Sequence, residues 1–398
     1  MKILIYTQYF GPETNAAANR TTDIAKYLSE RHDVSVLTGF PNHPLGKMIG
    51  NYKIKWLAVE KDFGIKIWRS FLIIPRKSNS KIWRYLNYYS FAFSSFLNLF
   101  RMRKPDVLFV SSPPISILIL AYMYAKIKKV KLVLDIRDLW PEAAISLKFI
   151  KKNIYISWLE KLVIKAYKYA NRITINTPAF EDVFKSYGCG DKLFYIPNGF
   201  DISKNLEIKK NDNKPNNTFK VFYAGLFGYA QNVNLLVETA RVASLSKNDI
   251  EFVLVGAGPM KERLQEKILK YGLHNIALLE YQPKDTLLNL IGECDLGVIT
   301  YEINDAFRKN IPSKIFDYMF MEKPILINLK GTASDMVQSG DFGFALETED
   351  PILFFEKIVA IKNNKNLKEK GENAFQYLKS DFDKRVLLEK LEKILTQW

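Results

Sequence analysis

Cysteine and histidine are scarce in this chain of 398 residues, and their scarcity excludes several kinds of site. The two cysteines, Cys189 and Cys294, cannot form a disulfide framework or a cysteine-based zinc site. The three histidines, His32, His43 and His274, lie far apart in the sequence, which argues against a histidine-built metal site. We therefore expect a protein of a reducing cytoplasm.

The familiar signatures of nucleophilic and metal-dependent catalysis are also missing. The chain has no G-x-S-x-G elbow, no Walker A loop and no H-E-x-x-H helix. Long hydrophobic runs are scarce as well, since the uncharged residues 107–125 are interrupted by Pro113 and Pro114. Because proline ends regular structure, this segment predicts a strand, a turn and a buried helix rather than a membrane span.

Acidic residues are few in the first half of the chain. Residues 1–200 contain 31 lysines and arginines against 14 acidic residues, whereas the rest of the chain contains 27 against 28. Residues 47–104 alone contain 13 basic and 2 acidic residues. A one-sided basic field attracts polyanions, so nucleic acid, an anionic membrane surface and a phosphorylated substrate are candidate partners.

An aromatic, uncharged segment lies within this basic region. Residues 85–100 hold seven aromatic side chains and no charge, and basic residues flank them at both ends. The segment is shorter than the roughly 20 residues that span a bilayer. A core helix and a helix at an anionic membrane interface are both compatible with this pattern. We expect residues 70–104 to face a membrane.

Short apolar strands alternate with helical segments along the chain, which predicts an α/β fold. The strand-like runs extend from Lys2 to residue 176 and, after a pause, from Lys220 to residue 328. Such alternation is typical of parallel sheets with helices on both faces. We expect two Rossmann-like domains facing each other across a cleft, with these boundaries: an N-terminal domain over 1–198, a linker over 199–218, a C-terminal domain over 219–380 and a C-terminal helix over 381–398.

Glycines follow the first expected strand of the second domain. Gly225 and Gly228 allow backbone N–H groups to approach an anion closely. Gln231 and Asn232 come next, at the expected start of a helix, where free N–H groups favour phosphate. A phosphate loop and a plain tight turn are both compatible with this pattern. Gly256 ends the following strand, and by itself this second glycine loop indicates a turn.

The run Pro312-Ser313-Lys314 predicts the start of a helix, with proline at its first position. Lys314 in the first turn opposes the helix dipole, so its charge is favourable only if an anion lies beside it. Asp317 follows one turn later on the same face. We interpret Lys314 as a ligand of a diphosphate and Asp317 as a ligand of sugar hydroxyls. A surface ion pair between the two is the alternative.

Four charged residues lie within residues 135–142, directly after another expected strand. Charged residues at a strand end usually face a cleft. Arg137 and Asp138 are therefore candidates for contact with a substrate, and a salt-bridged loop is the alternative. The small side chains of residues 16–18, just before Arg20, would permit close approach of a ligand.

In this order, the motifs resemble those of bacterial family 4 glycosyltransferases of the GT-B fold. They are similar to the members that build O-antigen, capsule or other surface polysaccharide on a lipid carrier. The resemblance runs nearly end to end and rests on these motifs: Tyr9-Phe10-Gly11-Pro12-Glu13, Pro41-Asn42-His43-Pro44, Asp135-Ile136-Arg137-Asp138-Leu139-Trp140-Pro141-Glu142, Ile196-Pro197-Asn198-Gly199, Tyr223-Ala224-Gly225, Val255-Gly256-Ala257-Gly258-Pro259, and Pro312-Ser313-Lys314 with Asp317-Tyr318-Met319.

The resemblance implies a sugar transfer from a UDP-sugar that retains the anomeric configuration and needs no metal or other cofactor. Asp138 and Lys314 would be the catalytic residues. The residues implied for donor binding are Asn15, Gly225, Gly228, Gln231, Asn232, Gly256, Gln282, Arg308, Lys309, Ser313 and Asp317. The residues implied for acceptor binding are Arg20, His43, Arg137 and Glu142.

The chain departs from the family pattern at several of these positions. Lys309 stands where many relatives have an acid, eight residues before Asp317, and Asp317 itself replaces the usual glutamate. Leu226 and Gln231 stand where many relatives have arginine and lysine. Lys314 and the basic residues just before it would then neutralise the diphosphate.

We expect a cytoplasmic enzyme at the inner face of the cell membrane. It would transfer a hexose or N-acetylhexosamine from a UDP-sugar to a polyprenyl-diphosphate-linked saccharide. A sugar-nucleotide 2-epimerase on a related fold and a non-catalytic membrane-bound scaffold are the alternatives. Nucleic acid is disfavoured because the second half of the chain has no basic excess.

Overall fold

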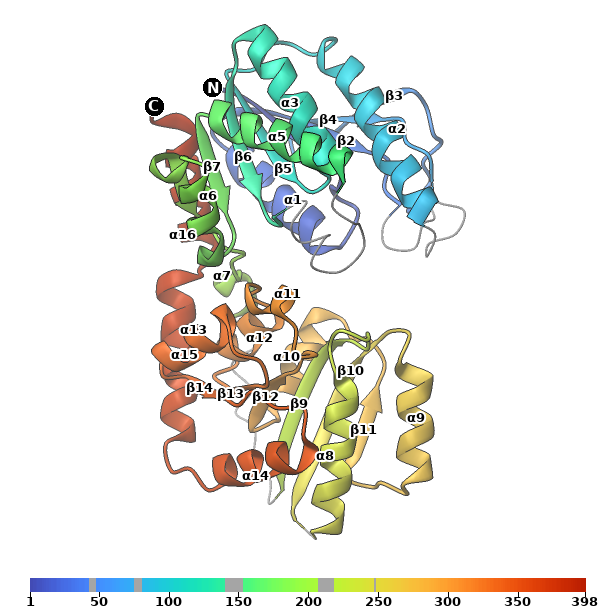
Figure 1. Cartoon of the computed structure of the whole chain (residues 1–398), viewed down its shortest axis with the longest axis vertical. Coiled ribbons are helices and arrows are strands. Elements are labelled where there is room, and N and C mark those ends of the chain that lie inside the picture. Colours follow the sequence, from blue (N-terminus) through green and yellow to red (C-terminus); the bar gives the residue numbers. More distant parts are fainter. Residues whose placement is uncertain (43–47, 75–80, 140–152, 207–217, 247) are drawn as a thin grey trace. The chain divides into compact units, whose positions relative to one another are not determined.

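The computed structural model describes the chain except for residues 43–47, 75–80, 140–152, 207–217 and 247, and it forms two α/β units (Figure 1). The first unit contains Met1–Pro197 and Leu388–Trp398, and the second contains Asn198–Leu387. Each unit has a central sheet of mainly parallel strands with helices on both faces. The predicted α/β fold with two Rossmann-like sheets is confirmed.

An eight-stranded sheet forms the centre of the first unit. Its strands are β1 (Lys2–Tyr6), β2 (Asp33–Gly39), β3 (Leu57–Asp62), β4 (Ile65–Ser70), β5 (Val107–Ser112), β6 (Lys131–Ile136), β7 (Arg172–Ile175) and β8 (Leu193–Tyr195). The strand order is β3-β4-β2-β1-β5-β6-β7-β8. Every neighbouring pair is parallel except β3 and β4, which form an antiparallel hairpin at the edge.

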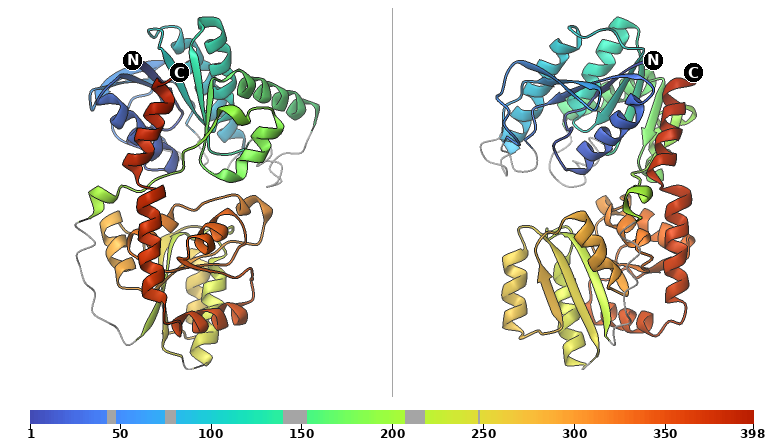
Figure 2. Two further views of the ribbon diagram at one scale, coloured as in Figure 1. Left: turned by 90° about the vertical axis from the view of Figure 1, so that its left-hand side faces the viewer. Right: turned by 180° about the vertical axis from the view of Figure 1, so that it is seen from behind.

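Helices cover both faces of this sheet. They are α1 (Ala16–Ser29), α2 (Lys81–Leu99), α3 (Ile115–Lys128), α5 (Ile154–Tyr169), α6 (Glu181–Ser186) and the end of α16 (Lys384–Thr396), with 3-10 turns at Pro178–Phe180 and Gly190–Lys192. Because side chains alternate along a strand, β1 contributes to two cores. Leu4 and Tyr6 pack with α2, α3 and α5, whereas Ile3 and Ile5 pack with α1 and the end of α16 (Figure 2).

The uncharged residues 107–125 form the strand, turn and helix that the sequence predicts. β5 is buried along its whole length and ends at Ser112, and α3 begins at Ile115 after two prolines. Among the described residues, no helix is long and apolar enough to cross a membrane.

A six-stranded, all-parallel sheet forms the centre of the second unit. Its strands are β9 (Phe219–Leu226), β10 (Ile250–Ala257), β11 (Ile276–Leu279), β12 (Leu296–Ile299), β13 (Ile325–Ile327) and β14 (Gly343–Ala345), in the order β11-β10-β9-β12-β13-β14. Its helices are α7 (Ile202–Asn205), α8 (Val233–Leu245), α9 (Lys261–Lys270), α10 (Lys284–Gly292), α11 (Asp305–Arg308), α12 (Lys314–Phe320), α13 (Thr332–Ser339), α14 (Pro351–Lys362) and α15 (Leu367–Asp381).

Part of the segment expected as a linker is packed into the second unit. Phe200 is buried, stacks on Phe320 with ring centres 4.7 Å apart, and forms a backbone bridge with Asp383. Ile202 begins α7 and is also buried. Residues 207–217 of the expected linker lie outside the described residues.

The strand order reverses beside the first strand of each sheet. β1 lies between β2 and β5, and β9 lies between β10 and β12. In open α/β sheets, ligands bind beyond the carboxyl ends of the strands at such a reversal. The loops after β1, β5, β9 and β12 are therefore the places where each unit can position functional side chains.

Candidate functional site

The loop at the end of β9 places Gly225 against Lys314. Gly225 has a φ of +148°, and a β-carbon there would lie 2.9 Å from the Lys314 amino nitrogen, Nζ. Gly256 is the partner of Gly225 on β10, and a β-carbon at Gly256 would overlap the carbonyl oxygen of Gly225. Both positions therefore require glycine, and the absent side chain at Gly225 leaves room for the lysine.

Lys314 is the first residue of α12, and its amino group is buried. Nζ lies 3.7 Å from the centre of the Tyr223 ring and has no hydrogen-bond partner in the described part of the chain. Burial lowers the pKa of Lys314 to about 7, although the nearby Asp317 carboxylate acts in the opposite direction. A buried amino group without an acceptor is unfavourable until an anion supplies one, so this arrangement is suited to binding phosphate.

Asp317 pairs with a different lysine. A carboxylate oxygen of Asp317 contacts Nζ of Lys284, the first residue of α10, and that Nζ also lies 4.9 Å from the centre of the Phe200 ring. Burial raises the pKa of Asp317, and Lys284 partly offsets this effect. The alternative of a surface ion pair between Lys314 and Asp317 is wrong, because Lys284 binds the carboxylate and both Asp317 and the Lys314 amino group are buried.

The start of α12 also differs from the expectation. Proline was expected at its first position, whereas the helix begins at Lys314, two residues after Pro312. Ser313 has helical dihedral angles, is exposed, and makes no side-chain capping hydrogen bond. Its side chain is therefore accessible to solvent.

Gln231 and Asn232 lie at the start of α8. The side-chain oxygen Oε1 of Gln231 is buried and has no hydrogen-bond partner among the described residues. A β-carbon at Gly228 would collide with that oxygen, so a larger residue there would displace the Gln231 side chain. Asn232 has a φ of +43°, and its side-chain amide donates to Glu349 over 3.2 Å. Gln231 offers an unused polar atom, whereas Asn232 is held by an acid.

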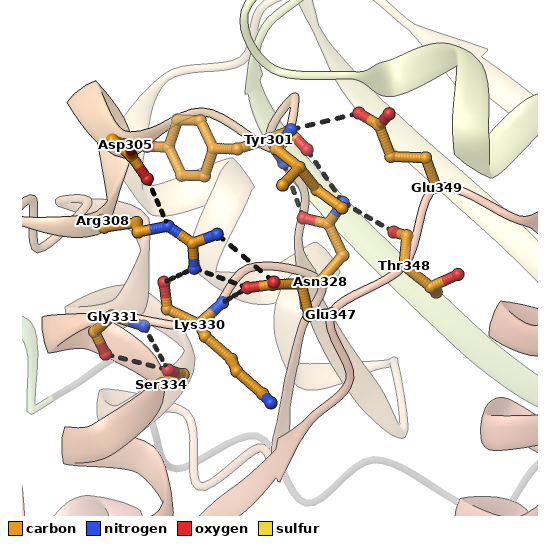
Figure 3. Close-up of polar contacts among 11 residues, drawn as sticks. Tyr301, Asp305, Arg308, Asn328, Lys330, Gly331, Ser334, Glu347, Thr348 and Glu349 are labelled. Atoms are coloured by element: carbon orange, nitrogen blue, oxygen red, sulfur yellow. Dashed lines mark hydrogen bonds and ion pairs between the residues drawn. The ribbon is translucent and has the colours of Figure 1, made fainter.

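Arg308 belongs to a polar network at the carboxyl ends of β12, β13 and β14 (Figure 3). Its guanidinium lies 2.6 Å from Glu347 and 2.9 Å from Asp305, and it donates to the carbonyl oxygen of Lys330. Glu347 also accepts a hydrogen bond from the backbone N–H of Lys330. Donor binding through Arg308 would require these contacts to open.

Asn328 joins the neighbouring loops within the same network (Figure 3). Its side-chain amide donates to the carbonyl oxygens of Tyr301 and Thr348, and its side-chain oxygen accepts from the backbone N–H of Tyr301. Glu349 accepts from the backbone N–H of Ile303 as well as from the side chain of Asn232. The loops after β12, β13 and β14 are thereby tied to the start of α8.

The remaining residues predicted for donor binding take no part in the contacts described above. Gln282 is half-buried, and its side chain donates to the backbone of Glu280 over 3.2 Å. Lys309 is also exposed. Asn15 lies in the first unit, where its side chain caps α1 by accepting from the backbone N–H of Ala18.

In the first unit, Asp135 and Arg20 form a buried ion pair at the end of β6. Arg20 donates through two nitrogens to the two carboxylate oxygens, at 2.9 and 3.2 Å, and Ser111 and Thr174 complete the shell. Burial raises the pKa of Asp135, but Arg20 outweighs it, so the pKa lies below the ordinary value.

Arg20 makes further contacts that bear on its predicted acceptor role. It donates to the carbonyl oxygens of Ile196 and Pro197, at the end of the first unit's main segment. Its side chain is only 7% exposed. The guanidinium therefore binds the protein itself, and any contact with an acceptor would be additional to these bonds.

Arg137 and Asp138 follow β6 directly. The side-chain Nε of Arg137 is buried without a hydrogen-bond partner in the described part of the chain, and its backbone N–H donates to Ser112. Asp138 is exposed, as a residue that meets a substrate would be. The predicted acceptor residues His43 and Glu142 lie outside the described residues.

The sequence analysis missed Lys284 and Tyr223. The sequence pattern predicts that Tyr223 is a core residue of a buried strand. It does not indicate that a lysine lies over the tyrosine ring. Lys284 carries a usable signal, because it follows Pro283 at the start of a helix and opposes the helix dipole as Lys314 does. Within the described residues, no group of three or more His, Cys, Asp or Glu side chains is arranged to hold a metal ion.

Comparison with known proteins defines the class of protein. Over 100% of both chains, the fold matches HepE from Anabaena in complex with UDP, with a TM-score of 0.68 and 17% identity. It also matches WaaG, a glycosyltransferase involved in lipopolysaccharide biosynthesis, over 99% of this chain and 100% of WaaG, with a TM-score of 0.66 and 14% identity. The fold is that of the GT-B glycosyltransferases.

The sequence comparisons are consistent with this class and add the family. Residues 17–204 match the family described as Glycosyltransferase Family 4, and residues 204–376 match Glycosyl transferases group 1. The chain belongs to these family 4, group 1 glycosyltransferases. WcaI of Escherichia coli K12, a glycosyl transferase named for colanic acid biosynthesis, is 26% identical over 332 residues, which are 79% of this chain and 80% of WcaI.

Proposed function

We propose that the second unit binds a UDP-sugar, with the diphosphate beside Gly225 and Lys314. The observation that carries this proposal is the buried amino group of Lys314, which has no hydrogen-bond partner in the described part of the chain. The unused oxygen of Gln231 and the exposed hydroxyl of Ser313 would add polar contacts near the same strand ends. The UDP complex of HepE, which has the same fold, supports a UDP-sugar as the donor.

The proposed reaction moves the sugar from the diphosphate to an acceptor hydroxyl. The bond between the anomeric carbon and the diphosphate oxygen breaks as the acceptor oxygen attacks from the same face, so the configuration is retained. Negative charge builds up on the departing UDP, and the Lys314 ammonium would stabilise it. The leaving phosphate oxygen would accept the acceptor's proton, and Asp138 is the other candidate for assisting this transfer. No metal is required in this scheme.

The proposed acceptor is a polyprenyl-diphosphate-linked saccharide of surface polysaccharide biosynthesis, such as O-antigen or capsule. The name of WcaI and the role of WaaG in lipopolysaccharide biosynthesis support this class of product. The transferred sugar would be a hexose or an N-acetylhexosamine, and the reaction would take place at the inner face of the cell membrane. The basic excess of the first 200 residues would favour a diphosphate-linked acceptor.

A transfer assay with a panel of labelled UDP-sugars, a polyprenyl-diphosphate-linked saccharide and EDTA tests the proposal. We expect label from one UDP-sugar to enter the lipid-linked product with retained configuration. Conversion of the donor without an acceptor would favour the 2-epimerase alternative. Donors that are left unchanged by a protein that still binds membranes would favour the scaffold alternative.

A further inference from the structure

The helix α2 carries apolar side chains on its outward side as well as on its inward side. Its outward side carries a continuous apolar stripe at helical spacing, which ends one residue beyond the helix. The stripe consists of Ile82, Leu86, Tyr89, Phe93, Leu97 and Phe100, all of which are exposed. Phe93 is 63% exposed and meets Trp56, also exposed, at a ring-centre distance of 6.3 Å.

The inward side of α2 buries polar residues beside apolar ones such as Phe91 and Leu99. Asn87, Ser94, Ser95 and Asn98 are buried. Asn87 accepts a hydrogen bond from Gln8 and donates to the backbone of Ile73, Ser95 bonds with the Tyr6 hydroxyl over 2.7 Å, and Asn98 donates to Ser70. These bonds fix the rotation of the helix, so the apolar stripe cannot turn inward without breaking them.

Two further helices extend this apolar surface. α3 packs between α2 and α5 on the same face of the sheet (Figure 1). Met123 and Ile127 are exposed on α3, and Ile154 and Trp158 are exposed on α5, at 91% and 55%. Three helices, which begin at Lys81, Ile115 and Ile154, thus present large apolar side chains on one side of the first unit.

Basic residues outnumber acidic residues on these three helices. α2, α3 and α5 together carry seven basic residues and one acidic residue, Glu160. Lys161, Lys165 and Lys168 are exposed along α5, on the same side of that helix as Trp158. Apolar and aromatic side chains bordered by lysines match the boundary between acyl chains and anionic headgroups.

We propose that the outer side of α2, α3 and α5, here called the three-helix face, docks on an anionic lipid bilayer. The stripe of α2 would enter the acyl boundary, and the lysines of α5 would meet the headgroup phosphates. A second copy of the chain is a poor occupant, because two such faces would bring their lysines together. The inference deepens the proposed function by naming where the enzyme meets the membrane, but vesicle binding itself does not require UDP.

Flotation of the full-length chain with vesicles tests the three-helix face. We expect the chain to bind phosphatidylcholine vesicles that contain phosphatidylglycerol and to bind pure phosphatidylcholine much less. Phe93→Ser/Leu97→Ser should lower the partition coefficient at least about tenfold, because two apolar side chains lose their burial in lipid. Lys161→Gln/Lys165→Gln should lower it roughly tenfold on the anionic vesicles only.

Matched variants in the second unit serve as controls. Leu245→Ser/Leu269→Ser removes two exposed apolar side chains, and Lys270→Gln/Lys379→Gln removes two exposed lysines. Both should bind vesicles as the unmodified chain does. Unchanged thermal unfolding would show that each variant is folded.

Two results would overturn the inference: no binding of the unmodified chain to anionic vesicles, or equal loss in the three-helix variants and their controls. A UDP titration of the same samples keeps the two proposals apart. Vesicle binding without UDP binding would contradict the proposed donor alone. UDP binding without vesicle binding would contradict the three-helix face alone and direct attention to a protein partner for it.

Discussion

The Asp317 carboxylate is bound by Lys284, which lies 33 residues before it, and not by Lys314, which lies one helical turn before it. Because Lys284 pairs with Asp317, the amino group of Lys314 is not held in an ion pair with that carboxylate. Lys284 partly offsets the burial of Asp317, and the amino group of Lys314 stays next to Gly225, with no hydrogen-bond partner in the described residues. The amino group of Lys314 is therefore available to an anionic ligand.

Replacement of Lys284 tests this division of roles. In Lys284→Met, the pKa of Asp317 should rise, and Lys314 becomes the nearest cation to the Asp317 carboxylate. We expect UDP affinity to fall about tenfold, which equals about 1.4 kcal/mol, by isothermal titration calorimetry. Lys284→Arg should retain most of the affinity. Lys270→Met removes an exposed lysine of the same unit and should leave UDP affinity unchanged; an equal loss there would contradict a specific role for Lys284.

The pKa of Lys314 predicts a pH dependence of UDP binding. Burial lowers this pKa to about 7 in the free protein, and a bound diphosphate should raise it. Affinity should be greatest below pH 7 and fall by up to about tenfold per pH unit above it, because the free amine must take up a proton to bind. The second pKa of a phosphate lies near 6, so the ligand's charge changes little above pH 7.

Calorimetry at pH 8 in buffers of different ionisation enthalpy measures this proton uptake. We expect nearly one proton per UDP for the unmodified protein and almost none for Lys314→Met. Equal proton uptake by the two proteins would show that a group other than Lys314 takes up the proton.

Gly225 should be essential for the geometry around Lys314. A β-carbon there would lie 2.9 Å from Nζ, and the φ of +148° is unfavourable for any other residue. Gly225→Ala should therefore displace the amino group and weaken UDP binding at least about tenfold. Gly272→Ala is the control, since Gly272 has a φ of +60° and open space around its α-carbon. The control should lose stability through strain, about 1 kcal/mol, and keep UDP affinity.

Arg20 should contribute chiefly to stability. Arg20→Ala leaves Asp135 buried without its ion-pair partner, which we expect to lower the free energy of unfolding by about 3–5 kcal/mol in a denaturant titration. Arg31→Ala breaks an ion pair with Glu392 whose arginine is half exposed, and it should cost much less than Arg20→Ala. Equal costs for the two variants would contradict a structural role for Arg20.

The same ion pair predicts how stability depends on pH. Burial alone would raise the pKa of Asp135, but Arg20 lowers it below the value in the unfolded chain. The stabilisation is then present above the unfolded-state pKa and is lost as the pH falls through the folded-state pKa. Acid should therefore destabilise the unmodified protein more steeply than Arg20→Ala.

Much of the fold could be predicted from local patterns. Buried parallel strands give short apolar runs, and the runs beginning at Lys2 and Lys220 mark the first strand of each sheet. The edge strand β3, which pairs with β4, could not be predicted in this way, because none of its residues is buried. β14, with three residues, is too short to show a period.

The candidate site could be predicted only in part, for a physical reason. Lys314 and Gly225 carry local signals, an opposed helix dipole and a glycine at a strand end. The contact of Lys284 with Asp317, and that of Arg308 with Glu347, depend on which helices and loops the sheet order brings together. The sequence shows that α2 contains an aromatic, uncharged segment. Only the structure shows that its apolar stripe faces outward, because the buried hydrogen bonds of Asn87 and Asn98 fix the rotation of the helix.

The central claim is that Lys314 and the strand-end glycines bind a UDP-sugar through its diphosphate. Calorimetric titration of the full-length chain with UDP in EDTA, with GDP and Lys314→Met as comparisons, tests it most directly. We predict saturable binding of UDP, weaker binding of GDP, and at least about a tenfold loss of UDP affinity in Lys314→Met. Equal binding of UDP and GDP, no binding of UDP, or unchanged affinity in Lys314→Met would contradict the claim.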